Sequence, residues 1–516
     1  MTDVTPQTPL LLDNAGHGRH VGHRAPRMLR PGPLAGRYPA VAAMVVLFLV
    51  PYLALSAALQ PIEPLIASTL HMSAQTTSLA SGMANAAYAA GTVLAVQFAQ
   101  HLHQRRMMLI YGVLLVVGSV LAASAVNAPM FIVGHILQGL CTSLLLIAAA
   151  PPLFLGYPAP MLRWTTMIMN MCIFGAVAAG PLIGGAQASF HAWRPLFWIA
   201  AGIAVLALLL ALLTFEDAPP ADQSAPKDVK AIALAAAGPV AAFWGVSELT
   251  THGFLDPVAI APLLGGLVLI IALWVYQYRG RRVLLTLRPL ASTFPVAGIV
   301  VAITAAAASV SATALAGASL ATRYAPLHLG LLFLPELGGA VLASIVFGVV
   351  FSSKYIHYFT LFGMACLAVG ILVIRTSIPP TPGIALAGTA LIGIGVGGSV
   401  VPALFLAGFS LRAASIQRVF AILELMRAIA AFMIVPILAH FATSLAGVPT
   451  AAMGTALWVC FGLAIGGTVL GVLIYVLGGA APVAPSLERF LGGVEPGWQS
   501  PPLLAAIRRQ RDLPLP

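Results

Sequence analysis

The sequence predicts an all-α membrane protein with about fourteen transmembrane helices. Of its 516 residues, 60% are hydrophobic and only 8% are charged, whereas roughly 25% of the residues of a typical soluble domain are charged. A soluble fold cannot bury that much apolar surface, but a bilayer can cover it. The apolar residues also come in runs of about 20, the length that spans the hydrocarbon core as a helix.

The apolar runs define the expected helices in chain order. Six of them precede a polar stretch at residues 216–230, which we expect to be a linker. Two further runs follow, and a second linker at 280–293 precedes the last six. The seventh run is short and ends before Glu248, so twelve spans are the alternative. The runs lie near residues 40–59, 79–98, 107–126, 131–155, 165–186, 195–215, 231–246, 257–276, 294–316, 329–351, 358–374, 384–409, 419–441 and 452–477.

Lysine and arginine orient the chain. If residues 1–39 are cytoplasmic, 21 of the 25 basic side chains fall on the cytoplasmic side, and Arg427 lies within a span. The opposite side holds only Arg194, Arg323 and Arg375. Cytoplasmic loops carry an excess of Lys and Arg, so we expect both termini in the cytoplasm and the protein in the cell membrane. This orientation, with anionic lipid headgroups, explains the net charge of +11 without a nucleic-acid partner.

We expect both tails to lie outside the packed core, and we expect no metal and no cofactor. Residues 1–39 lack the apolar centre of a cleavable signal and are expected to be disordered. Residues 479–516 form a Pro-rich tail, in which 503–511 fits a short amphipathic helix. The four cysteines lie in apolar runs without metal-ligand spacing, as small core residues do. The tail histidines, which fit a solvated run better than a metal site, are His17, His20 and His23.

A glycine-rich motif, GAVAAGPLIGG, occupies residues 175–185 within the fifth run. Glycines have no Cβ, so a neighbouring helix can approach closely, and Pro181 is expected to bend the span. A helix that packs closely and bends at one place suits a moving seam between two bundles; an ordinary small-residue contact is the alternative. The expected hinge residues are Gly175, Gly180, Pro181, Gly184 and Gly185.

This motif and its sequel resemble a known family. GAVAAGPLIGG is similar to the fifth-helix motif of drug:proton antiporters of the major facilitator superfamily. AWRPLFWI at residues 192–199 resembles the entry to their sixth helix, and IVGHILQG at 132–139 resembles their fourth-helix motif. RRVLLTLRPLASTFPVA at 281–297 is similar to the join after the two extra helices of the fourteen-span branch, and LLFLPELGGAVL at 331–342 to its tenth helix.

The resemblance implies an architecture. Two six-helix bundles, at residues 40–215 and 294–478, would face a central cavity, and two extra helices at 231–279 would stand between them. In such a fold the first and fourth helices line the cavity.

Three positions depart from the family pattern. Gln100 stands where the loop after the second helix normally carries Asp, so we expect neutral hydrogen bonds, with Arg105 and Arg106, to hold the cytoplasmic gate. His135 occupies the position of the fourth-helix Arg. Leu55 stands where the first helix of the family has Asp, so we do not expect cations to be recognised by a carboxylate at this position.

Ionisable side chains inside a membrane are costly and usually functional. Glu424 and Arg427 are three residues apart on one helix face and, at about 1.5 Å per residue, lie towards the midplane, where transporter sites lie. The pair is either a self-neutralised structural feature or one in which Arg427 holds Glu424 ready to exchange a proton or an anionic substrate.

Three shallower groups complete the coupling candidates. Glu63 lies between prolines that are expected to break the first span, and it can face His135 across the cavity. Imidazole has an unperturbed pKa of about 6.5, within the physiological range; a loop-edge Glu and a core His are the alternatives. Glu336 is expected near the membrane interface. The polar candidates for the cavity lining are Gln60, Asn85, Gln138, Asn170 and Ser399.

We therefore predict a secondary active transporter that exports small amphipathic organic compounds in exchange for protons. An importer or facilitator on the same fold is the first alternative. A membrane-embedded enzyme or lipid-handling protein is the second, but the sequence has no nucleophile elbow and no phosphate loop with a Lys. The expected partners are the small-molecule substrate, protons and membrane lipid, and we expect a monomer.

Overall fold

The computed structural model describes residues 32–214, 220, 227–280, 284–285, 287–444 and 449–505. The tail histidines, residues 1–31 of the tail expected to be disordered at 1–39, and most of the linker at 216–230 lie outside these described residues. Within the remainder of that tail, the Leu34 amide donates to the Leu213 carbonyl at 3.0 Å, and a helix begins at Tyr38. Within them, fourteen helical segments are long and apolar enough to cross a membrane. The prediction of fourteen spans is confirmed, and the alternative of twelve is wrong.

The N-terminal bundle contains six spans, and the extra pair follows it. Its fifth span combines a 3-10 turn, an α-helix, a π-helical turn and a second α-helix. The bounds are α1 Tyr38–Leu70, α2 Ala74–His101, α3 Gln104–Ala123, α4 Ala128–Leu155, then η1 Ala159–Met161, α5 Leu162–Asn170, η2 Met171–Gly175 and α6 Ala176–Ser189 for the fifth span, α7 Arg194–Thr214, and the extra pair α8 Val229–Glu248 and α9 Pro257–Arg279.

The C-terminal bundle also contains six spans. Its second span is divided into a short helix and a longer one. The bounds are α10 Thr293–Ala321, α11 Pro326–Leu332 with α12 Leu334–Val350, α13 Ile356–Arg375, α14 Pro382–Phe409, α15 Ile416–Ser444 and α16 Pro449–Leu477, with a short α17 at Leu487–Leu491 beyond the last span.

The helices begin where the sequence supplies caps. Free backbone N–H groups at a helix start need acceptors. The Asn127 side chain accepts from the Met130 amide at 3.0 Å at the start of α4, and Asp228 accepts from the Ala231 amide at 3.0 Å at the start of α8. Proline takes the first position of α9, α11 and α14, where its missing N–H costs nothing.

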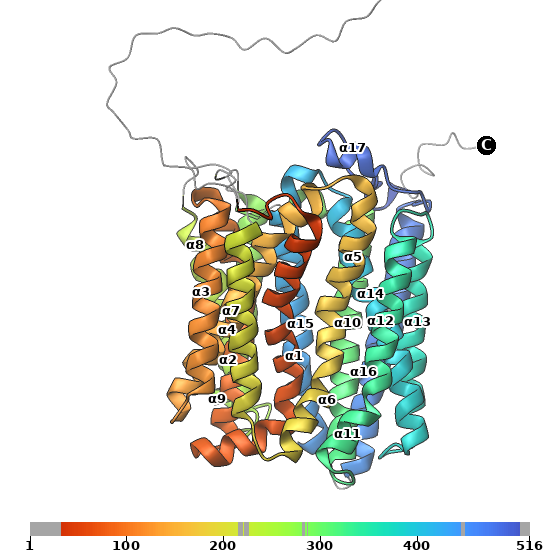
Figure 1. Cartoon of the computed structure of the whole chain (residues 1–516). Coiled ribbons are helices and arrows are strands. Elements are labelled where there is room, and N and C mark those ends of the chain that lie inside the picture. The colour runs from red at the N-terminus through yellow and green to blue at the C-terminus, as the bar shows by residue number, and fades with distance from the viewer. Residues whose placement is uncertain are drawn as a thin grey trace, which may run out of the picture.

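The helices stand side by side along one direction, with α1 and α15 in the middle of the view (Figure 1). Helix α2 packs against α15, and the segments α5 and α6 pack against α12 and α11. These contacts form the seam between the two bundles. The extra pair is attached to the N-terminal side, since α9 packs on α8 and α8 packs on α2.

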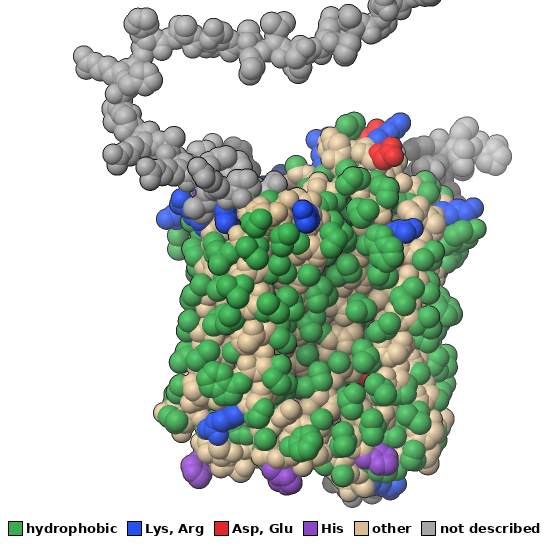
Figure 2. Space-filling view, viewed as in Figure 1, with side chains coloured by type: hydrophobic (Ala, Val, Ile, Leu, Met, Phe, Trp, Pro, Cys, Tyr) green, Lys and Arg blue, Asp and Glu red, His purple; other side chains and the backbone are tan. Residues whose placement is uncertain are grey.

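One end of the molecule carries most of the described basic side chains. Helix α1 begins there, and the short α17 lies over it (Figure 1). Figure 2 shows Lys and Arg gathered at this end and hydrophobic side chains covering the flank between the two ends. We call it the basic end; Arg194, Arg323 and Arg375 belong to turns or helix termini at the opposite end.

The predicted break in the first span is wrong. Helix α1 continues through Pro61 and Pro64 to Leu70. In a membrane, neighbouring helices and local adjustments satisfy the backbone groups that proline frees, so proline alone does not end a span. Pro402 likewise lies within an unbroken α14.

The irregular turn of the fifth span precedes Pro181 and does not coincide with it. Helix α6 runs through Pro181, whereas the π-helical turn η2 covers Met171–Gly175. Such turns occur mostly as single insertions in α-helices, frequently at functional sites. Gly175 therefore belongs to the π-helical turn, while the other predicted hinge residues belong to the regular helix after it.

The glycines of α6 permit two close helix contacts. A Cβ on Gly180 would lie 2.8 Å from the Ala58 nitrogen of α1, and one on Gly184 would lie 2.9 Å from the Ala58 Cα. A Cβ on Gly185 would overlap the Pro326 carbonyl group of α11 in the other bundle. Helix α6 thus touches both bundles at backbone distance near the end opposite the basic end.

The tail after Gly479 packs more closely than we expected. Phe490 is 0% and Trp498 is 2% exposed, and the Gly497 amide donates to the Phe409 carbonyl at 2.8 Å. Aromatic side chains that bury this much surface stabilise a segment even where prolines prevent a helix. Phe490 and Trp498 thus anchor the segment 480–505 to the core at the basic end, although most of its other residues are exposed or half-buried. Residues 506–511 of the predicted amphipathic helix lie outside the described part.

Candidate functional site: a buried ion pair at the seam

The centre of the seam holds an ion pair within α15. Arg427 Nε donates to Glu424 Oε2 at 2.9 Å, and Arg427 Nη2 donates to Glu424 Oε1. From α2 of the other bundle, the Tyr88 hydroxyl donates to Glu424 Oε1 at 2.7 Å. The side chains are 5%, 3% and 0% exposed for Glu424, Arg427 and Tyr88. The predicted pair therefore exists, and it is joined to the opposite bundle by a tyrosine.

The spacing of the pair explains its geometry. Residues three apart on a helix lie on the same face, so the planar guanidinium can reach both carboxylate oxygens at once, the strongest form of such a contact. Arg427 also lies 5.9 Å from the centre of the Phe432 ring. Breaking a buried pair by removing one partner costs about 3–5 kcal/mol, because it leaves a buried charge uncompensated.

Aromatic and polar side chains extend from the pair into the N-terminal bundle. Tyr88 stacks on Tyr52 of α1, with ring centres 6.0 Å apart, and the Tyr52 ring lies 5.7 Å from the His135 ring of α4. His135 Nδ1 is 3.1 Å from Gln138 Oε1, and the Gln138 amide donates to Ser119 Oγ at 3.0 Å. A continuous row of buried side chains therefore runs from the ion pair to the α3–α4 contact.

Tyr52 and Tyr88 were not among the residues predicted from the sequence. Tyrosine in membrane proteins is enriched at the two water interfaces. Both tyrosines lie many residues from the ends of their helices, so a mid-span tyrosine was the signal that we overlooked. The hydroxyl of such a residue needs a buried partner, which Glu424 provides for Tyr88.

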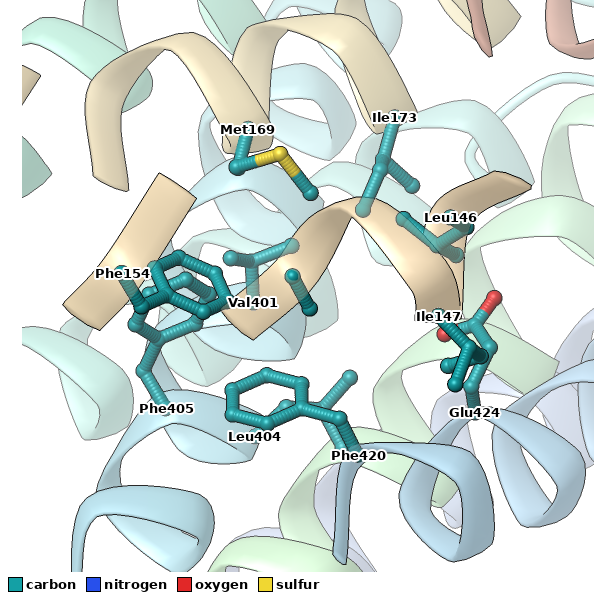
Figure 3. A pocket seen from close by; sticks show the side chains of 11 residues that line it. Leu146, Ile147, Phe154, Met169, Ile173, Val401, Leu404, Phe405, Phe420 and Glu424 are labelled. Carbon is teal, nitrogen blue, oxygen red and sulfur yellow. The ribbon is translucent and has the colours of Figure 1, made fainter. Parts of the chain in front are cut away.

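A small cavity lies beside the pair, between the bundles. Its volume is about 30 Å³, and Glu424 lies at its edge while Phe154 and Phe405 lie on the far side (Figure 3). Small-molecule sites usually measure about 300–1,000 Å³. The described arrangement is therefore closed around the pair and has no room there for an organic molecule. The remaining lining residues are Leu146, Ile147, Ala150, Met169, Ile173, Val401, Leu404 and Phe420.

An aromatic cluster closes the seam towards the basic end. Phe154 of α4 packs edge-on to Phe405 at 5.2 Å and stacks on Phe420 at 5.4 Å between ring centres. Phe420 and Gln417 both belong to α15, and the Gln417 side-chain amide donates to the Ile147 carbonyl at 3.3 Å. Side chains of both bundles therefore meet on this side of the cavity.

The opposite end of the seam is closed by backbone contacts. A Cβ on Gly330 of α11 would lie 2.8 Å from the Pro181 carbonyl oxygen. The exposed Gln60 of α1 donates to the Ala314 carbonyl of α10 at 3.5 Å. Of the predicted hinge residues, Pro181 and Gly185 thus lie at a contact between the bundles, whereas Gly180 and Gly184 pack on α1 of their own bundle.

The other predicted coupling residues lie apart from the pair. Glu336 is 6% exposed; it accepts from Thr313 at 3.2 Å through Oε1, and its Oε2 is buried without a partner among the described residues. Helix α12 packs this turn against α14, which buries Glu336; that it lies near the membrane interface stays a prediction. Glu63 is half-buried in α1. The described ring contacts of His135 are to Tyr52, Phe131 and Phe197.

The five polar candidates for the cavity lining are dispersed. Asn85 accepts from Tyr52 at 3.5 Å, and Asn170 donates across the seam to the Gly397 carbonyl at 2.7 Å. Ser399 bonds within its own helix. None of the five, Gln60 and Gln138 included, lines the cavity beside Glu424 in the part that the structure describes.

The predicted gate residues lie at the basic end of α2 and α3. Gln100 is buried and accepts from the Gln97 amide at 3.4 Å, and Gln97 Oε1 accepts from the Asp228 backbone amide at 3.0 Å. Arg105 donates to the Leu212 carbonyl at 3.0 Å, while Arg106 is exposed. Neutral hydrogen bonds thus connect α2 to the start of the extra pair.

Metal chemistry has no visible site here. Over the described ranges, no three His, Cys, Asp or Glu side chains are grouped so that they would hold a metal ion. The site consists of one ion pair, one tyrosine and apolar side chains.

Fold and site together define a polytopic membrane transporter, with two six-helix bundles facing each other across a seam that buries an ion pair. The Major Facilitator Superfamily model matches residues 44–362, more than half of the chain, and the chain belongs to that superfamily. Membership in this superfamily makes it a membrane transporter.

Individual relatives are distant. The chain is 24% identical over 177 residues to the MFS-type transporter YhcA of Bacillus subtilis, which covers 34% of this chain and 33% of that protein. It is 23% identical over 319 residues to the drug efflux pump JefA of Mycobacterium tuberculosis, which covers 58% of this chain and 60% of that protein. The chain thus spans from a third to three fifths of these curated relatives.

A solved structure supports the fold. The proton:xylose symporter XylE aligns with a TM-score of 0.58 over 84% of this chain and 94% of that chain, at 13% sequence identity. This likeness is one of fold alone.

Proposed function

We propose that this protein exports small amphipathic organic compounds in exchange for protons, with Glu424 as the proton-exchanging group. The observation that carries the proposal is the buried contact of Tyr88 with the Glu424–Arg427 pair across the seam. A carboxylate that exchanges protons between two sides of a membrane must be reachable from each side in turn. Glu424 stands where a rocking motion of the bundles would provide that access.

The cycle follows from the contacts of the pair. In the closed arrangement Arg427 and Tyr88 together hold the carboxylate ionised, because both donate hydrogen bonds to it. A proton taken up from the outer side weakens these bonds and frees Tyr88, so the bundles separate more easily and the cavity can open to the cytoplasm. Substrate that enters the enlarged apolar cavity there displaces the proton to the cytoplasm, and the next proton binds Glu424 after the substrate has left on the outer side.

The apolar lining supports the substrate class. Except for Glu424, the described residues around the cavity are aliphatic, aromatic or methionine. Such a surface binds apolar bodies, and the pair at its edge provides one polar anchor, as in most small-molecule sites. JefA is named a drug efflux pump, which supports export as the direction.

His135 and Glu63 are assigned supporting roles in the same proposal. His135 lies beside Tyr52, which stacks on Tyr88. A charge on the imidazole would therefore change the electrostatic potential along the row of side chains that leads to Glu424. We infer that coupling requires Glu424 and at least one of His135 and Glu63. A change in the pH profile of transport on His135→Ala, with no change in protein amount, is the expected sign.

The orientation in the membrane is part of the proposal. We infer that the basic end faces the cytoplasm and that the protein lies in the cell membrane as a monomer. The gathering of Lys and Arg at one end (Figure 2) supports this, since cytoplasmic loops are rich in these residues. Both termini and the gate residues Gln100, Arg105 and Arg106 would then be cytoplasmic.

The decisive experiment uses purified protein in sealed vesicles with an imposed proton gradient. A panel of amphipathic dyes identifies a transported compound first. Glu424→Gln should still bind that compound but should lose accumulation against its gradient, retaining at most downhill flux. Glu248→Gln is the matched control, because Glu248 is also a buried carboxylate but lies at the end of α8, bonded to Gln75 at 2.7 Å.

Two outcomes would contradict the proposal. Uphill transport by Glu424→Gln equal to that of the parent would make the pair structural. Uptake of the dye in the same direction as protons would identify an importer on the same fold. Substrate-induced proton release from the detergent-solubilised protein, present in the parent and absent in Glu424→Gln, provides a readout that needs no gradient.

A further inference from the structure

A second and much larger cavity lies on the flank of the molecule near the basic end. Its volume is about 590 Å³, within the usual range of about 300–1,000 Å³ for ligand sites. It lies between the end of α9 and the start of α10, and Met426 of α15 also lines it. We call it the flank groove. Its lining residues are Trp274, Val275, Tyr278, Arg279, Leu287, Leu290, Ala291, Val296, Ile299, Val300 and Met426.

The groove opens on the surface that faces lipid. Val275 is 44% and Tyr278 is 51% exposed, and both belong to a flank of α9 on which apolar side chains such as Val268 are also exposed. In a bilayer this surface meets acyl chains. Most of the lining is aliphatic or aromatic, as an acyl chain requires.

The rim of the groove adds positive charge, and a buried donor belongs to one of the lining residues. Arg279 lines the groove, and Arg288 is held beside it because its Nε donates to the Tyr278 carbonyl at 2.9 Å. Trp274 Nε1 is buried and has no hydrogen-bond partner among the described residues. No acidic side chain belongs to the described lining. Apolar walls below two guanidinium groups complement a molecule with an apolar tail and an anionic head.

We propose that the flank groove binds an anionic phospholipid of the surrounding membrane. One acyl chain lies along α9 and α10 against the Trp274 side chain, and the phosphate lies against Arg279 and Arg288. Basic pockets between transmembrane helices bind anionic headgroups in this manner. The groove is separate from the Glu424 cavity, and the inference does not rest on the proposed function.

The position of the groove gives the lipid a further effect. Helix α9 packs on α8, which packs on α2 of the N-terminal bundle, whereas α10 and α15 belong to the C-terminal bundle. Any movement of the bundles at the seam therefore changes the width of the groove. Met426 also precedes Arg427 in α15, so a lipid there touches the helix turn that carries the ion pair. The bound lipid should stabilise one arrangement of the bundles over the other.

The test uses the native fluorescence of Trp274. The full chain is placed in phosphatidylcholine nanodiscs that contain a small fraction of either brominated phosphatidylglycerol or brominated phosphatidylcholine, since bromine quenches an indole on contact. The signal of Trp274 is the difference between the parent and Trp274→Phe. We expect phosphatidylglycerol to quench it several-fold more effectively than phosphatidylcholine.

Variants separate a specific site from ordinary lipid contact. The double change Arg279→Gln with Arg288→Gln should remove the preference for phosphatidylglycerol, and Val296→Phe should lower quenching by filling the groove. Lys354→Gln and Val268→Phe are the matched controls for charge and size, because both lie away from the groove, and they should change nothing.

Three results would overturn the inference. Equal quenching by the two lipids would mean that the groove meets only bulk lipid. A preference that survives the double arginine change would place the headgroup elsewhere. Displacement of brominated phosphatidylglycerol by a transported dye at transport concentrations would make the groove a substrate site. The first two measurements need no transport, so failure there leaves the proposed function standing.

Discussion

The hydroxyl of Tyr88 lies 2.7 Å from the carboxylate of Glu424, and the two residues belong to different bundles. Both side chains are buried, so water does not compete for this hydrogen bond. The contact cannot persist if α2 and α15 move apart. Under the proposed function, it would couple the charge state of Glu424 to the closure of the seam.

Tyr88→Phe should loosen the seam. The change removes one hydrogen bond to a charged group, worth about 1.5–3 kcal/mol, and keeps the ring that stacks on Tyr52. Since every 1.4 kcal/mol is about tenfold, a cysteine placed at Ile147 in a cysteine-free background should be alkylated about 10- to 100-fold faster. Tyr111→Phe, another buried tyrosine of the same bundle, is the control. An unchanged rate would show that the bond contributes little to closure.

Gly180→Leu should abolish transport while the protein remains in the membrane. Even a Cβ at Gly180 would lie 2.8 Å from the Ala58 nitrogen, so a leucine must push α6 away from α1. Gly202→Leu is the control, because nothing lies within 4 Å of a Cβ there. Dye efflux at matched expression is the measurement, and normal efflux by the Gly180 variant would reduce the motif to ordinary packing.

Cysteine labelling should reveal the orientation. In a cysteine-free background, Ser352→Cys in the turn between α12 and α13 lies at the basic end, and Thr251→Cys lies after α8 at the opposite end. An impermeant maleimide added to intact cells should label only Thr251→Cys. Labelling of Ser352→Cys from outside would reverse the proposed topology.

Trp498→Ala should release the C-terminal segment. Loss of a buried Trp costs about 3–5 kcal/mol, so the amides of Gly497 and Thr293, which bond to Phe409 and Pro501, should exchange with deuterium about 100- to 1,000-fold faster. Trp244→Ala is the control, because that side chain is 45% exposed. Unchanged exchange would mean that Phe490 alone holds the segment.

The number of spans was predictable because apolar length is a direct consequence of bilayer thickness. The position of the Glu424–Arg427 pair was predictable too, since helical spacing alone puts both on one face. The effect of the prolines on their helices was not predictable. Whether Pro61 breaks α1 depends on the neighbours that accept its freed backbone groups, and these neighbours are distant in sequence.

Side-chain contacts between the two bundles were also not predictable from the sequence. Tyr88 and Glu424 are 336 residues apart, and no local pattern brings them together. The burial of Glu336 was not predictable for the same reason, since it comes from the packing of α12 against α14. The Pro-rich tail looked like a solvated segment because the rings that pack against Trp498 are distant in sequence. They belong to Phe351 and Phe409.

The ion pair of α15 has an electrical consequence. With Glu424 ionised, the pair carries no net charge, because Arg427 balances it. Under the proposed coupling, a proton on Glu424 gives the pair a net charge of +1, which is lost again when the proton leaves. Exchange of one proton for a neutral compound therefore moves one elementary charge across the membrane. Each such charge is worth about 2.3 kcal/mol per 100 mV. Export of neutral compounds would then respond to voltage as well as to acidity, whereas exchange of one proton for a monovalent cation would be electrically silent.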